Sequence, residues 1–475
     1  MIAGSMTRKY ALRRGMVLTL LTLLLAVSLT VQTQVAAAQS IAGQGVGGIV
    51  FFLGRSDTDG SGLIDPADNI ALYVGGLGRQ AQRISAEDAN VSQFSVTPDT
   101  TFAAYTATVP SGATILEIVA IANGSLRRVE LSETTPLSVD AFSDAVWVVA
   151  LNGSGVPVLR GFEPASGASI NSHTFRNPGT PVTIHSNGRF VLAFNEATGG
   201  LSVLRLPSLE LVQFPLSGFS TTAPSWSPTE PRFVMGVSGT QSLAGTILND
   251  INLNTGAVTQ LYTPDFPVTV PILWDWSPAG GFISMVRPQT SGRGLELVNV
   301  QTGQASSVLE EGQNHDIVTW SNDDRYVVIS RIAADGSAQD ATLFVFDTTS
   351  GALNPIAGLE NYTVAALGWR QDQPLLAIIG QNRSNGVVSL FMIEPLSGAN
   401  NPIFDGIDAT LLRSSPVRWT ADGRVVFFAS SSNDAVLTSA GTPIALYAAD
   451  ATGSQVIERI SPVNVVVDLL KLETR

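Results

Sequence analysis

A short phrase recurs through the second half of this chain: an aromatic residue, a serine or its substitute, a tight polar turn and an apolar run. It reads APSWSPTEPRFVMGV, LWDWSPAGGFISMV, VTWSNDDRYVVIS, ALGWRQDQPLLAII and VRWTADGRVVFFAS. The tryptophans at its centre are 50, 44, 49 and 50 residues apart, at Trp226, Trp276, Trp320, Trp369 and Trp419. A period of this length is typical of stacked or radially arranged repeat units.

The unit around Trp320 predicts four strands. Residues 316–320 form a first short strand, and a polar turn leads to RYVVIS at 325–330. A Gly/Asp/Ser loop precedes TLFVFD at 342–347, and a TTSG turn leads to a last strand near Leu353. Strands joined by turns of Asp, Asn, Ser and Gly indicate an antiparallel meander.

The first half of the chain carries the same unit in weaker form. Phe94-Ser95, Phe142-Ser143 and His185-Ser186 each stand where the tryptophan and serine stand later, which gives eight units in all. Residues 47–85 form a partial unit that lacks its first strand. Residues 462–468 are predicted to form one strand that belongs to none of the preceding units. We therefore expect the tail strand to complete the first sheet.

These observations predict an all-β chain that folds as a single β-propeller of four-stranded antiparallel blades. The number of blades is eight or nine, and the amino- and carboxy-terminal strands pair to close the ring. Closure removes the exposed sheet edges of an open array. An elongated β-solenoid is the alternative, but its coils are shorter than these units. One aromatic residue per unit is expected to pack between adjacent sheets.

The phrase W-S-P followed by an apolar run, and then by L-x-x-x-D/N-x-x-T/S-G, resembles the propeller repeats of the TolB type. Similar repeats occur in the propeller of prolyl oligopeptidase relatives. Residues 226–228, 276–278 and 419–423 match well, and the units before residue 200 have diverged. The resemblance implies a periplasmic or cell-surface propeller that acts by binding. No G-x-S-x-G motif follows the last unit, so the resemblance to prolyl oligopeptidase relatives is limited to their propeller.

Residues 1–38 are predicted to be a secretory signal peptide. A basic stretch at 8–14 precedes an apolar run at 16–31, and Ala36-Ala37-Ala38 offers a cleavage site. The run is short for a membrane span, so no transmembrane segment is expected after cleavage. The mature propeller would cover residues 39–475, and its location would be periplasmic, cell-surface or extracellular.

Charge and cysteine content exclude several classes of protein. The net charge is −13, and it becomes −17 without the four basic residues of the first 38. Lys471 is then the only lysine, so nucleic-acid binding is not expected. The chain has no cysteine, which excludes disulfides and thiolate chemistry. We expect a monomer stabilised by its core.

Residues 57–68 (DTDGSGLIDPAD) fit the 12-residue EF-hand loop and predict one structural calcium ion. Gly62 allows the sharp turn, and Ile64 is the apolar residue that anchors the loop. The loop resembles that of dockerins, because Asp68 replaces the usual last Glu, and strands rather than helices flank it. The predicted ligands are Asp57, Asp59, Ser61, Leu63 through its carbonyl, Asp65 and Asp68.

Two classes of function remain open from the residues, and a third, periplasmic assembly or envelope maintenance like that of the TolB proteins, rests on analogy of fold alone. The first is a non-catalytic binding or scaffold module for a protein or glycan. The second is a lyase or hydrolase that acts on a polysaccharide or peptide in the central channel. The groups available to an enzyme are His185, His315, Arg189 and Arg325, without assigned roles. His173 has no partner in the sequence, and Asp323-Asp324 are interpreted as turn formers.

Overall fold

The computed structural model describes residues 48–474 with gaps at 77–78, 196–199, 216–218, 221, 240–244, 267–274, 311, 334–341, 398, 408–416, 431–443 and 451–457. The predicted signal peptide therefore lies outside the described residues. Within these limits the chain is all-β, and no helix occurs. Accordingly, no helix in the described ranges has the length and apolar character needed to cross a membrane.

The sheets follow one another along the chain, and most contain four antiparallel strands. The first strands are β1 (Ile49–Arg55), β2 (Ile70–Gly76), β3 (Arg79–Arg83), β4 (Asn90–Val96), β5 (Phe102–Thr108), β6 (Thr114–Ala120), β7 (Leu126–Leu131), β8 (Thr135–Ala141), β9 (Val146–Leu151), β10 (Pro157–Phe162) and β11 (Ser169–Thr174).

The middle of the chain continues this pattern. It contains β12 (Val182–Ile184), β13 (Phe190–Asn195), β14 (Gly200–Arg205), β15 (Glu210–Leu211), β16 (Phe219–Ser220), β17 (Ser225–Trp226), β18 (Arg232–Ser238), β19 (Ile247–Asn252), β20 (Val258–Tyr262), β21 (Asp275–Trp276), β22 (Phe282–Pro288), β23 (Gly292–Asn299) and β24 (Ala305–Val308).

The remaining strands complete the last units. They are β25 (Gln313–Trp320), β26 (Tyr326–Ala333), β27 (Thr342–Asp347), β28 (Leu353–Pro355), β29 (Tyr362–Trp369), β30 (Leu376–Asn382), β31 (Val388–Glu394), β32 (Ala399–Ile407), β33 (Arg418–Trp419), β34 (Arg424–Ser430), β35 (Ile444–Asp450), β36 (Glu458–Arg459) and β37 (Val466–Thr474).

The four strands predicted around Trp320 are confirmed as β25 to β28, and β27 has the predicted bounds. Strands β21 to β28 form one eight-stranded sheet because β23 and β25 also pair, in parallel, at Gly292 and Arg293. Gly292 has φ +92, and a Cβ there would lie 2.1 Å from the carbonyl oxygen of Gln313. Only glycine permits this approach of the two strands.

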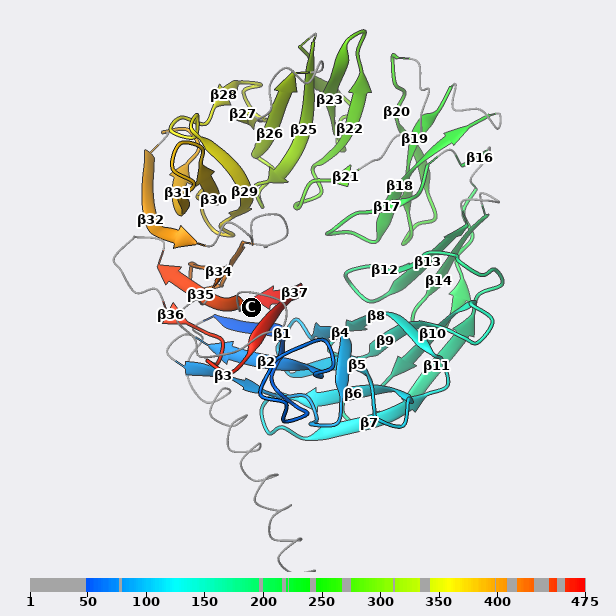
Figure 1. Cartoon of the computed structure of the whole chain (residues 1–475). Helices are drawn as coiled ribbons and strands as arrows, with labels where there is room; N and C mark the ends of the chain where they lie inside the picture. The colour runs from blue at the N-terminus through cyan, green and yellow to red at the C-terminus, as the bar shows by residue number, and fades with distance from the viewer. Residues whose placement is uncertain are drawn as a thin grey trace, which may run out of the picture.

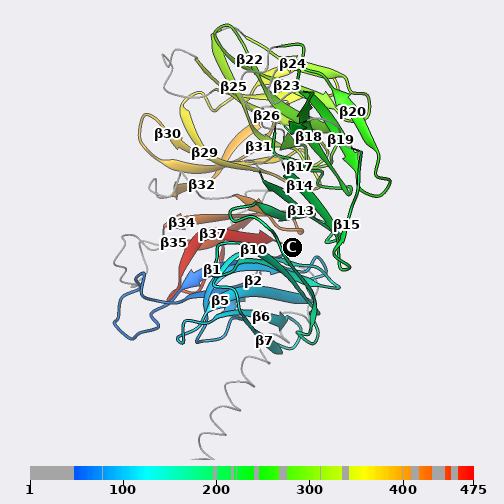
Figure 2. The same ribbon diagram turned by 90° about the vertical axis from the view of Figure 1, so that its right-hand side faces the viewer.

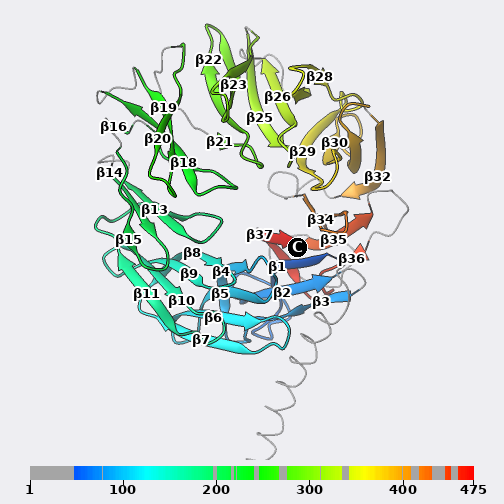
Figure 3. The same ribbon diagram turned by 180° about the vertical axis from the view of Figure 1, so that it is seen from behind.

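The sheets lie side by side around a central axis (Figure 1). Inner strands such as β12, β17 and β21 face the centre, and outer strands such as β7, β11 and β32 lie at the rim. The view from behind shows the same order (Figure 3). This radial arrangement differs from the linear stack of a β-solenoid.

The tail of the chain pairs with its beginning. Strand β37 lies beside β1 in both views (Figures 1 and 2), and the two are antiparallel, from Val50 opposite Thr474 to Arg55 opposite Val466. The strand predicted at 462–468 therefore begins later and extends further than expected, because residues 462–464 form a turn.

Hydrophobic clusters form between neighbouring sheets. Phe51 of β1 packs with Phe94 of β4 in one cluster, and Trp419 packs with Ile379 of β30 in another. Val50 of β1 packs with Val426 of β34, so the first and last sheets share a core as well. Burying each of these large side chains contributes roughly 1.5–3 kcal/mol. The stability therefore comes from contacts between sheets.

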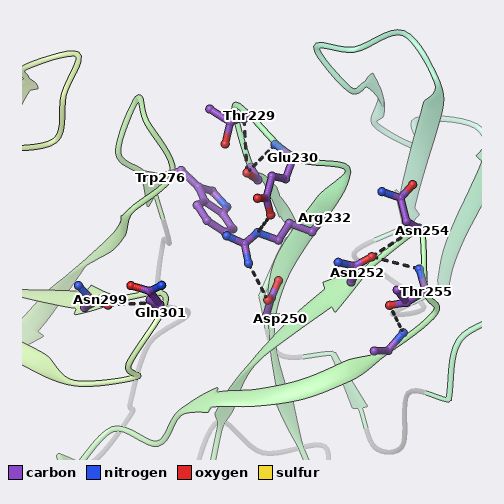
Figure 4. A network of polar contacts seen from close by, with 12 residues as sticks. Thr229, Glu230, Arg232, Asp250, Asn252, Asn254, Thr255, Trp276, Asn299 and Gln301 are labelled. Carbon is purple, nitrogen blue, oxygen red and sulfur yellow. Dashed lines mark hydrogen bonds and ion pairs between the residues drawn. The ribbon is translucent and has the colours of Figure 1, made fainter.

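A second turn recurs between the third and fourth strands of the units. Asn252, Asn299 and Asp347 each accept backbone N–H bonds from the second and third residues that follow them, at 2.8–3.3 Å. Figure 4 shows two of these turns. The glycine four positions on, such as Gly351 with φ +72, closes each turn. This is the D/N-x-x-T/S-G segment of the sequence.

Candidate functional site

The loop between β1 and β2 brings three of the six predicted calcium ligands together. One carboxylate oxygen from each of Asp57, Asp59 and Asp68 lies within 4.8 Å of the others. Asp57 and Asp59 are exposed, whereas Asp68 is buried. Calcium is held by carboxylate oxygens at 2.3–2.6 Å, so these groups could share one ion.

Backbone N–H groups hold the first carboxylate in place. The two oxygens of Asp57 accept bonds of 2.8 Å from Gly60 and from Gly62. Both glycines have positive φ, 76° and 81°, which allows the chain to fold back over the carboxylate. Ile64 is 6% exposed and anchors the loop, as the sequence predicted.

The other three predicted ligands bond to the loop itself. The Ser61 hydroxyl lies 3.1 Å from the Leu63 carbonyl oxygen and 3.2 Å from the Leu63 nitrogen. An Asp65 oxygen accepts the Ala67 N–H at 2.7 Å, and so caps the turn that follows Pro66.

Asp68 is the buried end of the cluster. Burial raises the pKa of its carboxyl, but hydrogen bonds from Thr58 and from the Asp65 N–H outweigh burial, and the pKa lies below its usual value. Asp68 is therefore ionised at neutral pH and needs no metal to remain so.

A second candidate site is a cavity of about 430 Å³ where the inner strands β21, β25, β29 and β33 meet. Its walls include the tryptophans of four consecutive repeats, which are only 3–7% exposed. The polar side chains on its walls include Asp275, Asn322, Gln371 and Arg418, all exposed.

The sequence analysis did not single out these four residues, although their positions carry a signal. Asp275 and Arg418 each precede the repeat tryptophan, where other units have Ser225, Thr319 and Gly368. Asn322 and Gln371 stand two residues after it, where other units have Pro228, Pro278 and Ala421. Comparing the repeats position by position would have found them.

The histidines do not converge on this cavity. His185 is 0% exposed, and its ring contacts the Glu230 carbonyl of the next sheet at 2.7 Å. His315 is 1% exposed, and burial lowers its pKa. His173 lies on the outer strand β11 and packs edge-on against Phe175.

The two arginines suggested for an enzyme also lie elsewhere. Arg325 is exposed, stacks over the Tyr326 ring at 4.9 Å and lies 3.7 Å from Asp347. Arg189 is exposed in the turn after His185. Neither arginine lines the cavity.

A half-buried ion-pair network within one sheet lies against a cavity tryptophan of the next sheet. The Arg232 guanidinium lies 3.2 Å from Asp250 and from Glu230, and 5.3 Å from the Trp276 ring centre (Figure 4). Burial raises the pKa of Asp250, and Arg232 opposes this. Each group is paired with another protein group, so the network holds β18 and β19 against Trp276.

No family model and no curated protein matches the chain. Among solved structures, a prolyl endopeptidase is 13% identical over 71% of this chain, with a TM-score of 0.43. The match covers 50% of the endopeptidase, so the chain spans about half the length of that protein.

Two further solved structures are similar. The β-propeller domain of the Trilobed protease from Pyrococcus furiosus is 12% identical, over 79% of this chain and 99% of that one, with a TM-score of 0.37. A putative TolB from Agrobacterium tumefaciens is 12% identical, over 50% of this chain and 84% of that one, with a TM-score of 0.29.

Proposed function

We propose that this chain is an exported, TolB-like β-propeller that acts as a non-catalytic binding module for a protein or glycan. The cavity at the inner strands carries this proposal. Among the residues that the structure describes, its polar walls include a single carboxylate, Asp275, and no histidine. General acid–base chemistry needs a proton donor and a proton acceptor within reach of the substrate. The cavity offers hydrogen bonds and charges without such a pair.

The ring is proposed to have nine blades, with the eight-stranded sheet counted as two and the first blade completed by β37. Two observations support this: β37 pairs with β1, and a hydrophobic cluster joins β34 and β35 to β1. The signal peptide predicted at 1–38 supports export. Mass spectrometry of the secreted protein is expected to find Gln39 at its amino terminus.

One calcium ion is proposed to bind the 57–68 loop, with Asp57, Asp59 and Asp68 as its carboxylate ligands and a structural role. Binding to the folded state raises stability by mass action. Calcium is therefore expected to raise the melting temperature of the wild type, and chelation to lower it.

The Asp59→Asn variant tests the ion directly. Its amide oxygen still accepts the Ser61 N–H bond, which is 2.9 Å long, but one negative charge is removed. We expect weaker calcium binding by titration calorimetry and a smaller thermal shift. Glu87→Gln, an exposed charge change elsewhere, should behave as the wild type. An unchanged melt of the wild type on chelation would remove the calcium proposal.

Native mass spectrometry tests the binding function. The mature protein is mixed with pools of short peptides and of oligosaccharides, and both complexes and products are measured. We expect a monomer that retains ligands of unchanged mass. Cleaved peptides or sugars would show that the protein is an enzyme and would overturn the proposal.

A further inference from the structure

The cavity at β21, β25, β29 and β33 contains polar groups that the protein leaves unpaired. Within the described ranges, Asp275 and Arg418 form no ion pair, and the Arg418 guanidinium donates only to the Val417 carbonyl, at 3.3 Å. The side chains of Asn322 and Gln371 have no protein partner there either. In the same turns, side chains outside the cavity are paired: Asp323 accepts from Ser321 at 2.6 Å, and Asp372 pairs with Arg370 at 2.6 Å.

Two hydrogen-bond donors buried behind the cavity wall are also unpaired. The indole nitrogens of Trp320 and Trp369 have no acceptor in the part of the chain that the structure describes. The two rings are 7% and 6% exposed. In contrast, Trp276 donates to the Ser225 carbonyl at 2.9 Å, and Trp419 donates to the Gly368 carbonyl at 2.8 Å. A buried indole N–H usually has a partner, but both nitrogens are themselves enclosed by the protein, so a ligand in the cavity does not reach them.

The order of these groups around the ring defines the shape of a ligand. Asp275 is on β21 and Arg418 is on β33, the first and the last along the chain of the four inner strands that line the cavity. The unpaired side-chain amides of Asn322 and Gln371 belong to the two repeats between them. One end of the cavity therefore favours a cation, the other favours an anion, and the middle can donate to carbonyl oxygens.

We propose that the cavity binds a short peptide with both ends free, its amino group at Asp275 and its carboxylate at Arg418. The side-chain amides of Asn322 and Gln371 donate to its carbonyl oxygens and accept from its backbone N–H groups. A cavity of about 430 Å³ falls within the usual range for small-ligand sites. This inference rests on the proposed binding function and specifies its ligand.

A glycan fits these walls less well. Sugars bind tryptophan through the exposed face of the ring, and the four cavity tryptophans are packed between sheets with at most 7% of their surface exposed. A neutral sugar would also leave the charges of Asp275 and Arg418 without counter-ions, whereas a zwitterionic peptide supplies both.

Alanine peptides of two to five residues are suitable probes, with titration calorimetry as the readout. One length is expected to bind best, because it spans the arc from Asp275 to Arg418. Acetylating the amino end, or amidating the carboxyl end, should weaken binding about tenfold each, since each removes a charge-assisted hydrogen bond.

Two variants locate the ends of the peptide. Asp275→Asn should weaken binding of the free peptide about tenfold and leave binding of the acetylated peptide unchanged. Arg418→Gln should weaken binding of the free peptide about tenfold and leave binding of the amidated peptide unchanged. Arg127→Gln is the matched control, because Arg127 is also exposed and also donates only to a neighbouring carbonyl, that of Leu126. It should bind as the wild type does.

The outcomes separate this inference from the proposed function. If no alanine peptide binds, or if binding is insensitive to Asp275→Asn and Arg418→Gln, the inference is wrong. Binding of chitotriose or cellotriose instead would overturn it and leave the binding function intact. Cleavage of the peptides would overturn the proposed function itself.

Discussion

The Asp324 carboxylate accepts a hydrogen bond of 2.6 Å from the hydroxyl of Ser277, in the neighbouring repeat. The same carboxylate accepts the backbone N–H groups of Ala279 and Gly281 at 2.8 and 2.7 Å. Asp324 is 4% exposed and has φ +61, a backbone conformation that Asp adopts more readily than most residues. Asp324 therefore links the turn of one repeat to the turn of its neighbour by hydrogen bonds, in addition to the turn-forming role that the sequence suggested.

Replacing Asp324 with Ala is expected to lower the free energy of unfolding by about 3 kcal/mol, because three donors lose their acceptor and Ala is strained at positive φ. Asp323→Ala is the control, since Asp323 bonds only within its own turn and is exposed. It should cost about 1 kcal/mol. Urea unfolding followed by tryptophan fluorescence measures both, and equal losses would contradict the role of Asp324.

Gly292→Ala should destabilise the pairing of β23 with β25 more than Gly312→Ala does. Both glycines have positive φ, but a Cβ at Gly312 meets nothing within 4 Å, whereas at Gly292 it would collide with the Gln313 backbone. We expect a loss of about 1 kcal/mol for Gly312→Ala and about 3 kcal/mol for Gly292→Ala. Similar thermal shifts for the two variants would show that the close approach is unimportant.

Trp419→Phe should cost more stability than Trp369→Phe. Both side chains are buried between sheets, so the loss of apolar area is similar. Of these two tryptophans, only Trp419 has an acceptor for its indole N–H, the Gly368 carbonyl oxygen. Phenylalanine at 419 leaves that oxygen without this hydrogen bond. The difference in unfolding free energy is expected to be about 1 kcal/mol. A larger loss at Trp369 in the ligand-free protein would contradict the assignment of its N–H as unpaired.

Acid should weaken the fold in the range below the ordinary aspartate pKa. A hydrogen bond from the Thr97 hydroxyl, with one from the Thr101 N–H, lowers the pKa of Asp99 to about 2. The folded state then binds fewer protons than the unfolded state between about pH 4 and 2. The stabilisation is complete above pH 4 and is lost as the pH falls through 2.

The Asp99→Asn variant tests this linkage, because it removes the titrating group. Its unfolding free energy should fall less steeply between pH 4 and pH 2 than that of the wild type. Equilibrium unfolding at a series of pH values measures the slope. Parallel curves for the two proteins would show that Asp99 does not contribute.

The sequence by itself determined the local structure. The apolar run after each polar turn favours a buried strand, and the glycine after Asp347 supplies the positive φ that the turn requires, so both could be predicted residue by residue. The carboxylates of the 57–68 loop could be placed in the same way, because Asp57 and Gly62 lie within one turn of chain.

Tertiary structure alone decided the contacts between repeats. Whether Asp324 reaches Ser277, and which indole groups find a carbonyl, depends on how neighbouring sheets are positioned against each other, which no single repeat specifies. The cavity is decided in the same way, since Asp275 and Arg418 are separated in sequence by more than two repeats. The radial packing of the sheets brings these residues to one cavity.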